Sequence, residues 1–110
     1  MPRKFRPYIP QTLGDLLDKL ASMRLGSPTF LDKTGYFPEE NLETNFGALN
    51  EGLRVLRPQL GEDRYRKLME MSDQMRAYFE ADPEGTGDAE KGREVIRDME
   101  ELVKAPGPKA

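Results

Sequence analysis

The segment "LETNFGALNEGLRVL", residues 42–56, sets the fold class, because its apolar residues recur at alternating spacings of four and three. These residues are Leu42, Phe46, Leu49, Leu53 and Leu56. The spacing is that of an a/d stripe over two heptads and predicts an amphipathic helix. Two heptads are too short for a free coiled coil, so the stripe indicates a helix packed within a bundle.

The flanks of this segment suggest where the helix begins and ends. Pro38 is a favoured first-turn residue, so we expect a start near it, and Pro58 and Gly61 should stop or kink the helix. Gly47 and Gly52 lie inside the helix and weaken it, by about 1 kcal/mol each relative to alanine. We therefore expect a neighbouring backbone to approach closely at these glycines.

Three further segments carry stripes of the same kind, at residues 11–24, 62–81 and 88–104. The stripes consist of Leu13, Leu16, Leu17, Leu20 and Met23, of Tyr65, Leu68, Ser72, Met75 and Phe79, and of Ala89, Gly92, Ile96, Met99 and Val103. Thr12, with Asp15 three residues later, predicts the N-terminus of the first helix. The sequence thus predicts an all-α fold: a small antiparallel bundle of about four helices. Residues 11–104 form the domain, residues 1–10 a basic arm and residues 105–110 a flexible tail.

One long ordered loop, Ser27–Pro38, should join the first two helices. It carries Phe30, Tyr36 and Phe37, more apolar surface than a free loop needs. One interpretation places these rings under the helices as part of the core. The other leaves them exposed as a recognition surface, because binding residues concentrate on ordered loops.

Composition narrows the classes of function. The 110 residues include no cysteine and no histidine, which excludes disulfides and thiolate metal sites and removes the usual general base. No nucleophile elbow, phosphate loop or dinucleotide fingerprint occurs. No apolar run is long enough to span a bilayer. We therefore expect a cytoplasmic protein that is not an enzyme and that uses no cofactor, metal or membrane.

The loop "ADPEGTGDAEKG", residues 81–92, resembles an EF-hand calcium loop in part. With Asp82 at position 1, the expected oxygen ligands and glycine fall at Glu84, Thr86, Gly87 and Glu90. Position 12, which needs a bidentate glutamate, holds Arg93 instead. The other interpretation is a helix stop at Asp82, a glycine turn, and a new helix capped by Thr86 or Asp88.

A nucleic-acid regulator is the alternative function. Arg64, Arg66 and Lys67 gather at the start of the third helix, and Arg57 lies before the turn at residues 60–62, which could belong to a helix-turn-helix. Neighbouring acids and a net charge of −3 oppose this reading. We expect Arg64 and Arg66 to pair with nearby carboxylates or to cover apolar surface with their stems.

Protein binding is the favoured function. Met69, Met71 and Tyr78 extend beyond one narrow helical face, and a protein partner or a homodimer would cover them. From Asp82 to Glu101, eight acids stand against three bases. The acids Asp88, Glu90, Glu94 and Asp98 open the last helix and predict contact with a basic partner. A small acidic inhibitor, or an immunity-type protein that blocks a basic effector, is one concrete form of this prediction.

Overall fold

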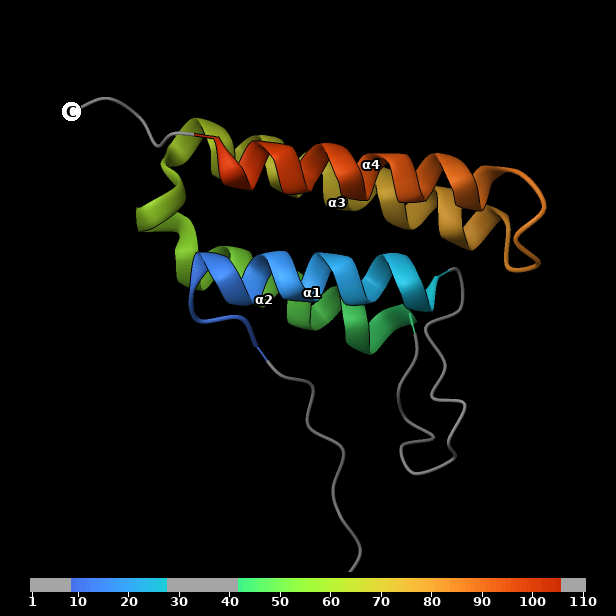
Figure 1. Cartoon of the computed structure of the whole chain (residues 1–110), viewed down its shortest axis with the longest axis horizontal. Helices are drawn as coiled ribbons and strands as arrows, with labels where there is room; N and C mark the ends of the chain where they lie inside the picture. The colour runs from blue at the N-terminus through green and yellow to red at the C-terminus, as the bar shows by residue number, and fades with distance from the viewer. Residues whose placement is uncertain (1–8, 28–41, 106–110) are drawn as a thin grey trace, which may run out of the picture.

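The computed structural model describes residues 9–27 and 42–105 as four α-helices, and these ranges contain no strand. The helices are α1 (Leu13–Gly26), α2 (Leu42–Leu60), α3 (Glu62–Ala81) and α4 (Asp88–Lys104). Figure 1 shows α3 and α4 side by side in one layer, with α1 and α2 in the other. The predicted all-α class and helix number are confirmed.

The helices close into a ring in which each one packs mainly against two others. α1 and α3 both pack against α2 and α4. Between α1 and α4, the Arg24 side chain meets Glu100 and the Ser27 side chain meets Arg93, so the two helices run antiparallel. Successive helices reverse direction as well (Figure 1), and the antiparallel bundle is therefore as predicted.

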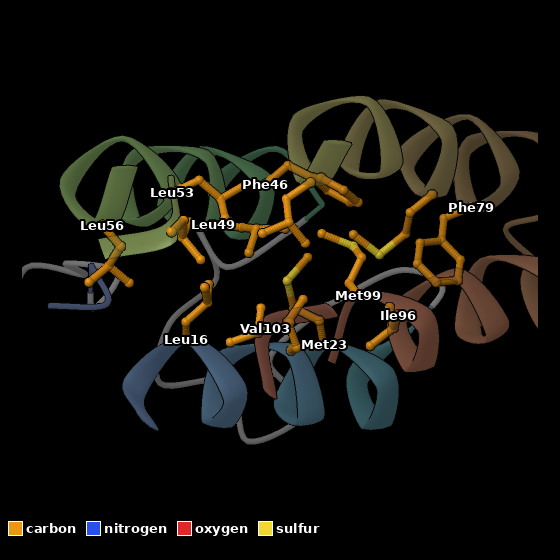
Figure 2. Close-up of a cluster of buried hydrophobic side chains, with 14 of the residues drawn as sticks. Leu16, Met23, Phe46, Leu49, Leu53, Leu56, Phe79, Ile96, Met99 and Val103 are labelled. Carbon is orange, nitrogen blue, oxygen red and sulfur yellow. The ribbon is translucent and has the colours of Figure 1, made fainter. Parts of the chain in front are cut away.

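The predicted stripes meet in a single core. Figure 2 shows Leu16 and Met23 of α1 facing Leu49 and Leu53 of α2, in one cluster with Ile96, Met99 and Val103 of α4. Most stripe residues are fully buried. The others are partly buried and pack against the core, and they are Leu13, Leu17, Leu42 and Tyr65. Ser72, the one polar stripe residue, is buried because its hydroxyl donates to Asn50 Oδ1 at 2.7 Å.

Helix ends follow the expected signals with two differences. Thr12 caps α1 by accepting a hydrogen bond from the Asp15 N–H at 3.0 Å. The Asp15 carboxylate reaches the N–H of Gln11 rather than that of Thr12, one residue earlier than a capping box requires. α2 continues through Pro58 and ends at Leu60, since Gly61 adopts a φ of 84° that favours glycine and breaks the helix.

The glycines differ in what surrounds them. A β-carbon on Gly52 would lie 2.8 Å from the ring of Pro10, whereas Gly47 has nothing within 4 Å. The expected close approach therefore occurs at Gly52 but not at Gly47, and the approaching group is a side chain. Because Pro10 is buried on α2, the packed part of the chain begins before residue 11.

Some sequence predictions fall outside the described residues. The rings of Phe30, Tyr36 and Phe37, and the start of the second helix near Pro38, belong to residues 28–41. Most of the basic arm and of the tail also lies outside the described ranges. Within those ranges, no helix combines the length and apolar character that crossing a bilayer requires.

Candidate functional site

The acidic loop is organised around the carboxylate of Asp82, which is 7% exposed. Its Oδ2 accepts hydrogen bonds from the N–H groups of Gly87 at 2.7 Å and Ala89 at 2.9 Å. Its Oδ1 accepts from the N–H and the hydroxyl of Thr86, at 3.0 and 3.1 Å. The hydrogen bond from Ala89, followed by those from Thr86 and Gly87, holds the pKa of Asp82 well below its usual range.

This geometry changes the interpretation of the loop. The N-cap of α4 is Gly87, which has no side chain to cap with, so the expected caps Thr86 and Asp88 are wrong. Asp82 supplies the missing acceptor from the end of α3. A cation at Asp82 would have to displace its hydrogen-bond donors. The described residues also contain no group of three or more acidic side chains that could hold a metal ion.

Arg64, a candidate for nucleic-acid contact, donates to main-chain carbonyls rather than to a carboxylate. Its Nε donates to the Leu60 carbonyl at 3.0 Å, and one terminal nitrogen donates to the Ala105 carbonyl at 2.7 Å. Further acceptors are the carbonyls of Gln59, Leu102 and Val103. The expected carboxylate pair is therefore wrong for Arg64, and a phosphate contact there would have to replace these bonds.

Two of the other basic candidates, Arg57 and Arg66, contact Glu62. Arg57 binds this carboxylate with two nitrogens, at 2.8 and 2.6 Å, and Arg66 approaches it at 3.3 Å, as expected. The hydrogen bond with Glu62 raises the pKa of Arg57, and the same bond lowers the pKa of Glu62. Arg57 also stacks over the Tyr65 ring at 4.6 Å. Lys67, the remaining candidate, is exposed. Two of these guanidinium groups therefore already face a carboxylate.

The apolar candidates on α3 are less exposed than the sequence suggests. Met69 and Met71 pack partly buried against the core, and Tyr78 is also partly buried. The reason is that α3 has a neighbour on each side, α2 and α4. Large exposed apolar side chains among the described residues are instead Leu25 and Val55, at 84% and 42%.

The acidic candidates on α4 fall into two groups. Asp88 pairs with Lys91 at 3.4 Å, while Glu90 pairs with Arg93 at 2.9 Å and Arg97 at 3.3 Å. The hydrogen bonds from Arg93 and, to a lesser extent, from Arg97 lower the pKa of Glu90. The first two predicted acids are therefore neutralised within the helix.

Glu94 and Asp98 form the second group, and Glu101 joins them. All three are exposed and have no hydrogen bond or ion pair with another described residue. Their spacing of four and three residues places them along one outer face of α4, opposite the buried stripe. We call these three residues the acidic ridge. Sequence reasoning missed Glu101, although its position seven residues after Glu94 marks the same face.

A cleft of about 260 Å³ borders the ridge between α1 and α4. Its lining residues are Arg24, Arg97, Glu100, Glu101 and Lys104. Within it Arg24 approaches Glu100 at 3.3 Å, and the two side chains are 32% and 14% exposed. Only Glu101 belongs to both the cleft and the ridge. The ridge thus borders a surface of mixed charge on its α1 side.

The comparisons with known proteins yield no relative from which a function could be transferred. No protein-family model matches the chain, and neither the curated proteins nor the solved structures contain a match.

Proposed function

We propose that this protein acts without catalysis, by binding a basic protein through the acidic ridge of α4. The observation that carries the proposal is the set of exposed carboxylates on Glu94, Asp98 and Glu101, which have no ion-pair partner among the described residues. A small inhibitor or immunity-type protein that masks a basic effector is the concrete form of this function.

The pairing along α4 supports the proposal. Lys91, Arg93 and Arg97 could neutralise the ridge, but they are paired with Asp88 and Glu90 toward the start of the helix. Surface ion pairs are worth only about 0–1 kcal/mol each, so their main consequence here is electrostatic. They leave the ridge with a net negative field that a basic surface would complement.

The helix sets the geometry of the expected contact. A rise of about 1.5 Å per residue spaces the carboxylates of the ridge over roughly 10 Å of the helix axis. A partner with lysine or arginine side chains at a similar spacing, on a helix or along a groove, could meet all three. Such a row of charges accelerates the encounter more than it strengthens the final complex.

A capture experiment tests this function. The chain is immobilised in three forms and exposed to lysate from its own cells: wild type, Glu94→Gln/Asp98→Gln/Glu101→Gln, and a control with three other exposed acids neutralised. The control is Asp18→Asn/Glu43→Gln/Asp73→Asn, which removes the same charge from α1, α2 and α3. We expect a stoichiometric basic protein on the wild type and the control but not on the ridge variant. Equal capture by all three forms, or no stoichiometric partner for the wild type, would overturn the proposal.

A further inference from the structure

The two ends of α4 are both held by charged side chains that belong to the two ends of α3. Asp82 follows directly after Ala81, the last residue of α3, and contacts the start of α4. Arg64 lies in the first turn of α3 and contacts the end of α4. Because the helices are antiparallel neighbours, one helix can hold its partner at both termini.

At the N-terminus of α4, an anion meets the positive end of the helix dipole. The carboxylate of Asp82 accepts the N–H groups of Gly87 and Ala89, which have no acceptor within their own helix. Each carries part of the positive charge of the helix start. The contact therefore satisfies two orphan donors and complements the dipole at the same time.

At the C-terminus of α4, a cation meets the negative end of the dipole. One terminal nitrogen of Arg64 lies 3.2 Å from the Leu102 carbonyl, 3.4 Å from that of Val103 and 2.7 Å from that of Ala105. The remaining nitrogens contact the last carbonyls of α2. A single guanidinium thus donates to terminal carbonyls of two helices. A lysine ammonium lacks the planar fork of N–H donors that this geometry uses.

Between these ends, α4 lies very close to α3. A β-carbon on Gly92 would stand 2.6 Å from the ring of Phe79, so the absence of a side chain lets the ring lie on the helix. Phe79 and Gly92 are both buried. This apolar contact lies nearer to Asp82 than to Arg64 along α4, and Ile96, Met99 and Val103 bury the rest of the helix in the core.

We propose that Asp82 and Arg64 act as two separate latches, each of which keeps one end of α4 closed against α3. Opening one latch frays that end of α4, and for Arg64 it also frees the last carbonyls of α2, while the apolar core holds the rest of both helices. The inference concerns the free chain and stands independently of the proposed function. Its consequence is that α4 can loosen at either end while α2 and α3 stay folded.

Hydrogen exchange on the purified chain, measured amide by amide, tests the two latches. The variants are Asp82→Asn and Arg64→Met, with Asp73→Asn and Arg66→Met as controls on exposed positions of α3. Asp82→Asn should speed exchange at Gly87 and Ala89 at least tenfold, and Arg64→Met should do so for the last turn of α4. In each variant the amides at the freed end should exchange at least tenfold faster than the core amides of α2 and α3. The core rates should rise only by the factor that the variant's loss of global stability sets, and the controls should change neither end.

Two results would overturn the proposal. One is exchange at the freed end that is no faster than in the core amides of α2 and α3, which would mean that this end opens only when the whole bundle unfolds. The other is exchange at both ends of α4 that matches the controls. If Arg64→Met does not fold, Arg64→Lys replaces it, because the ammonium keeps the positive charge and lacks the fork of donors. Faster exchange at the C-terminal end of α4, and not at its N-terminal end, is then the expected result.

Discussion

Replacing Arg64 with methionine should cost far more stability than the same replacement of Arg66, two residues away on α3. Methionine keeps an apolar stem of similar length and removes every donor. Three of the Arg64 bonds lie at 3.2 Å or less, to the carbonyls of Leu60, Leu102 and Ala105. Hydrogen bonds to charged groups contribute about 1.5–3 kcal/mol each, but one partly exposed guanidinium shares these acceptors with water, so we expect a total loss of about 2–3 kcal/mol.

Arg66 provides the scale for a surface arginine. Its only partner among the described residues is Glu62, at 3.3 Å, and its side chain is 72% exposed. An exposed pair of this kind is worth about 0–1 kcal/mol. Urea denaturation of both variants and of the wild type measures the difference directly, provided that the slope with denaturant is unchanged. In a thermal scan, the Arg64 variant should melt roughly 10–20 °C lower than the wild type.

The contrast between the two arginines carries the prediction. If both variants lose the same small amount of stability, the carbonyl contacts of Arg64 contribute nothing beyond an ordinary surface charge. Arg64→Lys should fall between Arg64→Met and the wild type, since the ammonium keeps the charge at the end of α4 and loses the fork.

Three further outcomes are expected. The pKa of Asp82 in the folded chain lies below its unfolded value of about 4, so the carboxylate stabilises the fold fully above that pH and progressively less below it. The stability difference between wild type and Asp82→Asn, measured by urea titration, should therefore shrink below about pH 4. A difference that stays constant would contradict this. Gly47→Ala should stabilise the chain by about 0.5–1 kcal/mol, because nothing lies near the added β-carbon. Gly92→Ala should destabilise it by up to about 2 kcal/mol, because the added β-carbon would clash with the Phe79 ring. Equal changes in the urea denaturation of the two variants would contradict this difference in packing. Gly61→Ala should cost about 1–3 kcal/mol at its φ of 84°, and a neutral result in the same assay would contradict the requirement for glycine between α2 and α3.

Periodicity predicted the helices and the core well because both depend on local spacing. The bounds expected for the third and fourth helices agree with α3 and α4, and the buried face of each agrees with its stripe. Ser72 shows why even a polar stripe residue followed the pattern: an acceptor on α2, Asn50, satisfies its hydroxyl. Such a partner cannot be read from the sequence of one helix.

The candidate site was harder to predict because its main contacts join residues far apart in the chain. Arg64 is 41 residues from Ala105, so spacing along α3 could suggest only nearby carboxylates. The start of α4 is capped from outside the helix by the Asp82 carboxylate, and not by the side chains of the nearer candidates Thr86 and Asp88. The acidic ridge was partly predictable, since the excess of acids in the last helix identified Glu94 and Asp98. Only the pairing seen in the fold separates them from Glu90.

The salt dependence of association tests whether the acidic ridge recognises a partner. Association rate constants for the captured partner are measured for wild type, the ridge variant and the control variant between roughly 0.01 and 1 M salt, over which the Debye length falls from about 30 to about 3 Å. For wild type and control, the rate constant should fall at least tenfold across this range. The ridge variant should associate slowly at low salt and change little. Equal rate constants and equal salt dependence in all three forms would contradict recognition through Glu94, Asp98 and Glu101.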